Sequence, residues 1–307
     1  MKYFKYILIV IISFTLVSIV YARDSNEGKG KIIKKLISKR QDLKKNEPLP
    51  EGIAAKYDIP YIKDNDPGHV LDIYRPEGKN GPLTVLFHIH GGGWRTGDKN
   101  MMFDTGVFYA SQGFIFITPN YRLSPEYVHP AHIEDCAAAL AWTFGHLKEL
   151  GGDKTRVFVS GHSAGAHLAA LLGTNNKYLQ KYNINLHRLA GVIPVDTASF
   201  NLISNKNEKP VKKMIEEAFG TDKEMLKDAS PFYNIAKEIK YPDFLVLNTT
   251  NRRSAAKEAE KFVKKLKNTG CNARFIPVDN HTHSEMATGM FDLSDPVGSA
   301  ILRFLKQ

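Results

Sequence analysis

The sequence predicts an α/β fold with a mainly parallel central sheet and helices on both faces. Short apolar runs rich in β-branched residues alternate with helical patterns along most of the chain, an order typical of parallel strands joined by crossover helices. The chain is also long enough, at 307 residues of which 43% are hydrophobic, to bury both faces of such a sheet. We therefore expect one large domain, which we place at residues 51–307.

The first 22 residues have the pattern of a secretory signal peptide. Lys2 and Lys5 precede fifteen largely apolar residues, 6–20, and Ala22 is the small residue before the expected cleavage site. The apolar run is shorter than the about twenty residues of a usual membrane span, so an uncleaved anchor is the less favoured alternative. We expect cleavage after Ala22, a secreted or periplasmic protein, and no stable membrane association after cleavage.

Residues 23–50 form a basic segment, with nine Lys or Arg against four Asp or Glu. Apolar residues at helical spacing, ended by Pro48 and Pro50, favour a solvated amphipathic helix or linker. Attachment to an anionic membrane surface or polysaccharide is the alternative. The formal net charge is +10, or +8 once Lys2 and Lys5 are removed, but no nucleic-acid-binding motif accompanies it. We therefore expect no nucleic-acid partner.

The elements of the domain follow from hydrophobic periodicity. His69–Pro76 alternates apolar and polar residues and ends in proline, as an early antiparallel strand does. Pro82–His90 is a nearly continuous apolar run, typical of a strand buried on both faces. Further strands are expected at 114–120, 156–160, 189–195, 244–248 and 273–278, and helices at 134–147, at 255–267 and from Pro296 onward.

The stretch from Val157 to Leu172 spells strand, tight turn and helix around a Gly-x-Ser-x-Gly pentapeptide. A serine that attacks an acyl carbon projects from a strained turn, where Gly161 and Gly165 lack the Cβ atoms that would clash. Ser163 is therefore the candidate nucleophile. A plain strand-to-helix turn is the alternative interpretation.

Several ordered segments resemble the α/β-hydrolase fold, in particular the esterase group that includes hormone-sensitive-lipase-like and kynurenine-formamidase-like enzymes. The segments are His90-Gly-Gly-Gly-Trp94, Gly161-His-Ser-Ala-Gly165, Leu71-Asp-Ile-Tyr-Arg-Pro76, Asn120-Tyr-Arg-Leu-Ser-Pro-Glu126 and 130–135. The resemblance covers roughly residues 60–306. It implies an α/β-hydrolase fold. Residues 197–243, between the sixth and seventh strands, are more than an ordinary crossover needs, and 210–219 has a helical pattern. This small insert is either a cap over the site or surface decoration.

The resemblance also assigns the groups around Ser163. The amides of Gly92, Gly93 and Ala164 are expected to form the oxyanion hole, since side chains at the glycines would block the acyl group. The general base is expected on the loop after the last strand, where His283 fits the pattern better than His281. The histidines at 88, 90, 162 and 167 are expected to have structural roles.

The acid of the triad departs from the pattern of the resembling enzymes. They usually place an aspartate after the strand expected at 244–248, but that loop reads Thr249-Thr-Asn-Arg-Arg-Ser254 and holds no carboxylate. Asp196, at the end of the preceding parallel strand, is the nearest substitute, although a helix cap or turn residue fits it equally well. Asn251 and Asp279 are the alternatives.

These residues predict an exported serine hydrolase that cleaves carboxylic esters of short acyl chains, carbohydrate-linked esters among them, through an acyl-enzyme. The alternatives are an amide or lactone hydrolase of the formamidase type and a catalytically impaired binding protein on the same fold. Arg252 and Arg253 could meet a substrate carboxylate, or lie at the surface as solvated charges. No cofactor is implied. Export would permit a disulfide between Cys136 and Cys271, but one lies in an expected helix and the other before a late strand, so we expect two separate buried thiols. Neither cysteine has zinc-ligand spacing, so we expect no metal site.

Overall fold

The computed structural model describes residues 48–79, 81–204 and 209–307. The expected signal peptide and all but the last three residues of the basic segment 23–50 lie outside the described residues. Both therefore stay predictions.

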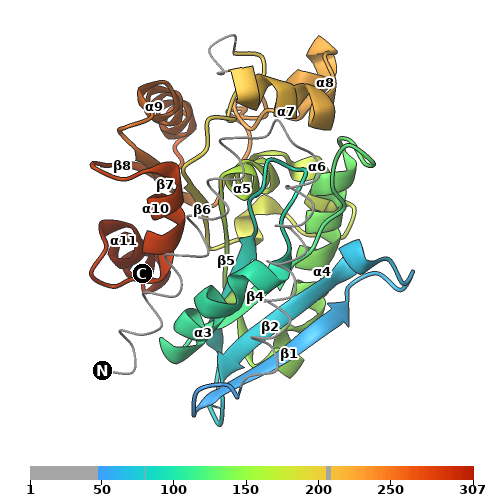
Figure 1. Ribbon diagram of the computed structural model, residues 1–307, viewed down its shortest axis with the longest axis vertical. Coiled ribbons are helices and arrows are strands. Elements are labelled where there is room, and N and C mark those ends of the chain that lie inside the picture. The colour runs from blue at the N-terminus through green and yellow to red at the C-terminus, as the bar shows by residue number, and fades with distance from the viewer. Residues whose placement is uncertain (1–47, 80, 205–208) are drawn as a thin grey trace, which may run out of the picture.

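The described residues form an eight-stranded, mostly parallel sheet, which confirms the predicted fold class (Figure 1). The strand order is β1-β2-β4-β3-β5-β6-β7-β8. Strand β2 pairs antiparallel with both β1 and β4, and every later pairing is parallel. The strands are β1 (Ile53–Pro60), β2 (Val70–Pro76), β3 (Leu83–Ile89), β4 (Ile115–Pro119), β5 (Gly152–His162), β6 (Gly191–Val195), β7 (Asp243–Thr249) and β8 (Ala273–Val278).

Helices cover both faces of the sheet. One apolar core lies under α4, α5 and α9, and a second lies under α3, α10 and α11. Successive residues of a central strand enter opposite cores: Val85 and Phe87 belong to the first and Leu86 to the second. The helices are α3 (Phe103–Ser111), α4 (Ala131–Leu150), α5 (Ala164–Thr174), α6 (Asn176–Gln180), α7 (Lys209–Phe219), α8 (Lys223–Asp228), α9 (Arg253–Lys267), α10 (His283–Thr288) and α11 (Pro296–Leu305).

The edge strand β1 was not predicted from the sequence. Asp58 adopts a left-handed conformation with φ 54°, and the pairing with β2 shifts its register between Lys56 and Ile59. This irregularity breaks the alternation of apolar and polar residues that identifies a strand. The helix α3 was also not predicted, because its glycine and aromatic residues are weak helix formers. In the structure this helix packs onto β2 and β4.

The insert between β6 and β7 carries α7 and α8, which lie together at one end of the molecule (Figure 1). The helix predicted at 210–219 is present as α7. Its last residue, Phe219, is fully buried and packs edge-on against Trp94 and His167, with ring centroids 5.0 and 5.3 Å apart. The insert is therefore docked onto both the glycine-rich loop, through Trp94, and the helix after Ser163, through His167.

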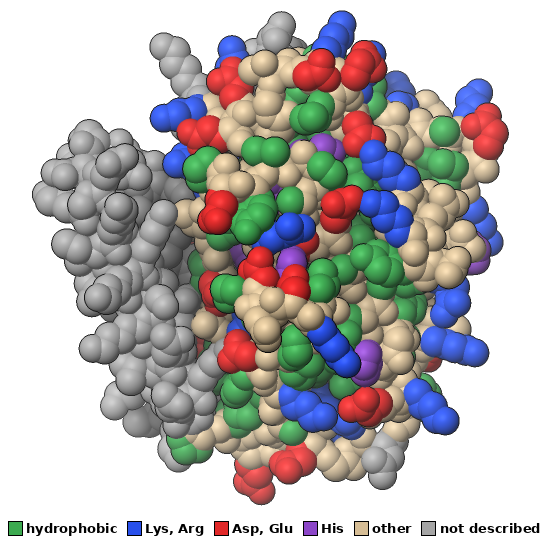
Figure 2. Space-filling view, turned by 90° about the vertical axis from the view of Figure 1, so that its right-hand side faces the viewer, with side chains coloured by type: hydrophobic (Ala, Val, Ile, Leu, Met, Phe, Trp, Pro, Cys, Tyr) green, Lys and Arg blue, Asp and Glu red, His purple; other side chains and the backbone are tan. Residues whose placement is uncertain are grey.

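Cys136 and Cys271 are separate free thiols, as expected, and Cys136 is buried. Cys271 is only partly buried, because it lies in the connection between α9 and β8. Within the described residues, every helix is too short or too polar to cross a membrane. Figure 2 shows a face on which Lys and Arg side chains are interspersed with Asp and Glu. The positive charge of the chain is thus not gathered into one basic patch on that face.

Candidate active site

Ser163 lies at a sharp turn between β5 and α5. Its backbone has φ 59° and ψ −119°, a conformation that L-residues rarely adopt. The turn is tight enough that a Cβ on Gly161 would lie 2.3 Å from Gly165 O, and one on Gly165 would lie 2.1 Å from Ile89 O. The Ser163 amide donates to Val195 O at 3.0 Å, which ties the turn to the end of β6. The residues thus form the strained turn between strand and helix that the pentapeptide predicts.

The glycine-rich loop after β3 lies beside this turn. Gly91 packs against the residue before Ser163, since a Cβ on it would lie 2.9 Å from His162 O. Gly92 and Gly93 have φ values of 123° and 61°, which favour glycine. A Cβ on Gly93 would lie 2.5 Å from the sulfur of Met214, on α7 of the insert. The insert therefore reaches the residues expected to form the oxyanion hole.

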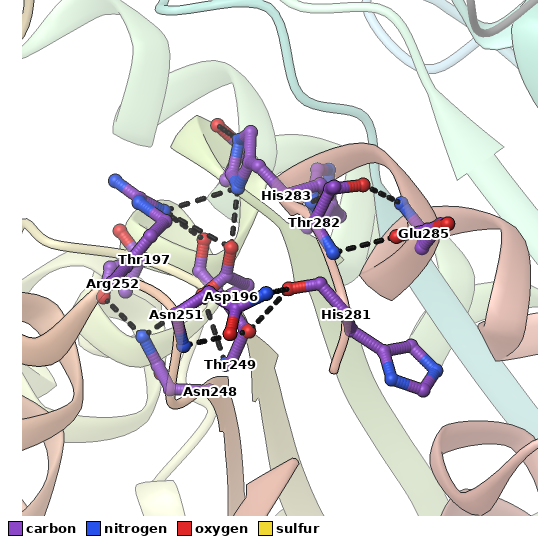
Figure 3. Close-up of polar contacts among 12 residues, drawn as sticks. Asp196, Thr197, Asn248, Thr249, Asn251, Arg252, His281, Thr282, His283 and Glu285 are labelled. Atoms are coloured by element: carbon purple, nitrogen blue, oxygen red, sulfur yellow. Dashed lines mark hydrogen bonds and ion pairs between the residues drawn. The ribbon is translucent and has the colours of Figure 1, made fainter. Parts of the chain in front are cut away.

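His283 is the histidine that the structure brings to Ser163. Its Nε2 lies 2.9 Å from Ser163 Oγ. His283 is the first residue of α10, whose start is fixed by reciprocal hydrogen bonds between Thr282 and Glu285. The imidazole of His281 instead contacts Asp279 O and Asp295 Oδ2, and it points away from Asp196 (Figure 3).

Asp196 is the carboxylate that the structure brings to His283, through a hydrogen bond between Asp196 Oδ2 and the imidazole Nδ1 (Figure 3). The alternatives lie elsewhere. Asn251 donates its amide to His281 O at 2.9 Å, and Asp279 accepts from Thr250 Oγ1 at 2.6 Å. Of the three candidates for the third residue of the triad, only Asp196 is hydrogen-bonded to the His283 imidazole.

The end of β7 holds Asp196 from the other side. Asp196 is fully buried, and its Oδ1 accepts hydrogen bonds from Asn248 Nδ2 at 3.2 Å and Thr249 N at 3.3 Å. Burial raises the pKa of this carboxyl, but the hydrogen bond and charge of His283 and the charge of Arg252 outweigh it and lower the pKa to about 2. Asp196 is therefore ionised at neutral pH.

His162 has the structural hydrogen-bonding role that was expected, and its partner is His283. Its Nε2 donates to the backbone oxygen of His283 at 2.9 Å, and the two rings lie 4.4 Å apart. Burial, followed by the neighbouring His283, lowers the pKa of His162 well below its usual value, so it stays neutral and keeps this bond. The sequence placed His162 next to Ser163 but did not indicate the contact with His283.

The other histidines near the site make structural contacts, as expected. His88 Nδ1 lies 2.9 Å from Ser160 Oγ, and His167 Nε2 donates to Ala229 O at 2.8 Å. The ring of His90 stacks on Tyr121 with centroids 4.4 Å apart. Burial lowers the pKa of His88 and of His167 to about 3, so both are neutral at physiological pH.

One group of described side chains could offer three ligand atoms to a metal ion: His162, Asp196 and His283, with these atoms within 4.8 Å of one another. We assign no metal there. Nη1 of Arg252 lies 3.0 Å from both Asp196 Oδ2 and His283 Nδ1, so a guanidinium cation already lies beside this hydrogen-bonded pair. From the sequence, Arg252 was expected to contact a substrate carboxylate or to be a solvated surface charge, and its contact with Asp196 and His283 was not expected.

Solved structures agree with this architecture. Esterase B from Lactobacillus rhamnosis superposes with a TM-score of 0.73 at 20% identity, over 91% of this chain and 95% of that one. A truncated carbohydrate esterase from gut microbiota superposes with a TM-score of 0.67 at 22% identity, over 85% and 98% of the two chains. These likenesses show the α/β-hydrolase fold.

Sequence comparison gives the family. Among curated proteins, the probable carboxylic ester hydrolase LipM of Mycobacterium tuberculosis is 39% identical over 117 residues, which are 37% of this chain and 27% of LipM. The chain thus spans about a quarter of the length of that relative. The model of the BD-FAE family matches residues 71–266, which include β2 to β7 and the turn that carries Ser163. The chain belongs to the BD-FAE family.

Proposed function

We propose that this protein is a serine hydrolase that cleaves carboxylic esters through an acyl-enzyme. The observation that carries the proposal is the continuous line of contacts from Ser163 Oγ through His283 to Asp196. A serine hydroxyl is a weak nucleophile until a base accepts its proton, and His283 Nε2 is within hydrogen-bond distance to do so. The carboxylic ester hydrolase LipM and other esterases among the relatives support the reaction class.

In the proposed reaction, Ser163 Oγ attacks the ester carbonyl while its proton passes to His283 Nε2. The carbonyl electron pair moves onto oxygen, and the negative charge lies opposite the amides of Gly92, Gly93 and Ala164. Ala164 is the first residue of α5, where backbone amides have no partner within the helix. The tetrahedral intermediate then expels the alcohol, which takes the proton from His283. Water repeats the sequence on the acyl-enzyme and releases the acid.

We propose a preference for short acyl chains. The insert presses Met214 against Gly93, beside the expected oxyanion hole, and so narrows the space next to the scissile carbonyl. The insert is thereby proposed as a small cap over the site. Export through a signal peptide cleaved after Ala22 is part of the same proposal and is supported by the pattern of residues 1–22. Carbohydrate-linked esters are proposed as substrates on the combination of that export with the esterases among the relatives.

The test is a hydrolysis panel on residues 23–307 with p-nitrophenyl acetate, butyrate and octanoate, a feruloyl ester, an acetylated xylo-oligosaccharide and an N-formyl amide. We expect turnover of the short esters, and we expect Ser163→Ala to lower kcat by about 10⁴ or more. Ser254→Ala, an exposed serine on α9, is the matched control and should leave turnover unchanged. Turnover of the amide alone would favour a formamidase-type enzyme, and no turnover of any substrate would favour a binding protein.

A further inference from the structure

Arg252 reaches the two residues behind the proposed nucleophile. It is the last residue before α9, and its side chain is 29% exposed. Its Nη1 lies 3.0 Å from Asp196 Oδ2, 3.0 Å from His283 Nδ1 and 3.4 Å from Asp196 O. One guanidinium nitrogen therefore contacts both the proposed acid and the proposed base (Figure 3).

This contact completes the hydrogen bonding of a buried carboxylate. Oδ1 of Asp196 accepts from Asn248 and Thr249, and Oδ2 accepts from His283 and Arg252. A buried carboxylate is costly unless it is paired, and a guanidinium remains charged at every pH at which the protein is folded. Arg252 thus keeps Asp196 ionised even when His283 is neutral.

The same contact acts on the proton of His283. For Nε2 to accept the proton of Ser163, Nδ1 has to carry a hydrogen and donate it to Asp196. Nη1 of Arg252 can only donate, so in this tautomer both Nη1 and Nδ1 donate to the single oxygen Oδ2. When His283 becomes an imidazolium, that cation forms 3.0 Å from a second, permanent one.

We propose that Arg252 is a positioning residue that holds Asp196 toward His283 and, through its charge, extends the activity of the site to lower pH. This inference rests on the proposed function. The guanidinium repels an imidazolium that forms 3.0 Å away, so its charge should affect the pH at which the activity of the site is lost in acid. The other charged or titratable groups around His283 are Asp196 from β6, His162 from β5 and Glu285 on α10.

The test is the pH dependence of kcat/KM between pH 4 and 9 for Arg252→Gln and Arg252→Lys, with p-nitrophenyl acetate and the chain 23–307. Glutamine removes the charge, so the imidazolium forms more easily. The acid limb of the kcat/KM profile, where activity falls as the pH is lowered, should therefore move to higher pH by about one unit. Lysine keeps the charge near the site, so the acid limb should stay where it is in the wild-type protein, while the looser fit lowers kcat. Arg253→Gln, at an exposed neighbouring arginine, should change neither quantity.

An acid limb that does not move in Arg252→Gln would overturn the proposal, whatever happens to kcat, because a purely structural role lowers activity at every pH alike. If Arg252→Gln does not melt cooperatively, Arg252→Met keeps the aliphatic stem and gives the same test. The wild-type protein separates the two proposals. If it hydrolyses the ester and only the acid limb fails to move, the role of Arg252 is wrong and the proposed function stands. If it does not hydrolyse the ester, both are wrong.

Discussion

Asp196 is held on both of its oxygens, by the end of β7 on one side and by His283 and Arg252 on the other. It adopts φ 50°, a left-handed conformation that is unusual for a residue other than glycine, and it is fully buried. A turn residue or helix cap does not need this set of contacts. The acid of the proposed triad therefore follows β6, the strand before the one expected from the resemblance.

Substitution of Asp196 should separate it from its rivals. In Asp196→Asn the imidazole loses the partner that fixes its tautomer and stabilises its cation, so we expect kcat to fall on the order of 10² to 10⁴ with little change in KM. Asn251→Ala and Asp279→Asn are the matched controls and should cost far less, since neither side chain contacts the His283 imidazole. A larger loss in Asn251→Ala than in Asp196→Asn would assign the role to Asn251.

At the residue scale, the sequence was sufficient for some side chains and not for others. The strained turn at Ser163 could be predicted because it has a local sequence pattern, and a capping-box pattern, Thr282-x-x-Glu285, was available to favour His283 over His281. The choice between Asp196 and Asn251 depends on which side chain meets an imidazole 87 residues from Asp196 along the chain. The contact of Arg252 with both Asp196 and His283 also depends on how separate segments pack in the fold, so no local sequence pattern predicts it.

At the scale of elements, the proposed cap is the insert between β6 and β7. Met214 on α7 packs over Gly93. Phe219, at the end of the same helix, packs edge-on against both Trp94 and His167. Arg95, from the loop after Gly93, also pairs with Glu217 of α7 at 3.0 Å. The helix is thereby held at a fixed position over the glycine-rich loop.

Met214→Ala should relax the preference for short acyl chains. It removes the side chain beside Gly93, so we expect the ratio of kcat/KM for p-nitrophenyl octanoate over acetate to rise about tenfold. Met225→Ala, at a 40% exposed methionine on α8, is the control and should leave the ratio unchanged. An unchanged ratio in Met214→Ala, or a wild-type preference for octanoate, would contradict the proposed cap.

Prediction of secondary structure from the sequence failed where tertiary packing, and not the local sequence pattern, determines the element. The strands with continuous apolar runs, such as β3 and β4, were predicted to within one or two residues because both of their faces are buried. Strand β1 was missed because its pairing is irregular at Asp58. Helix α3 was missed because tertiary contacts with β2 and β4, more than helix propensity, stabilise it.

At the scale of the whole molecule, the proposal of export concerns residues outside those described. If residues 1–22 are a signal peptide, protein extracted from its native source should begin at Arg23. The intact mass should then be lower than that of the full chain by residues 1–22. Recovery of the full-length mass from washed membranes would instead support an uncleaved anchor.

The central claim is that Ser163 is an activated nucleophile, and covalent labelling tests it most directly. A fluorophosphonate probe reacts with a serine only where a base and an oxyanion hole activate it. We predict one adduct on the wild-type protein by intact mass, mapped to the peptide that contains Ser163, and none on Ser163→Ala. Ester hydrolysis by the wild-type protein without an adduct at Ser163, or undiminished labelling of Ser163→Ala, would contradict the account.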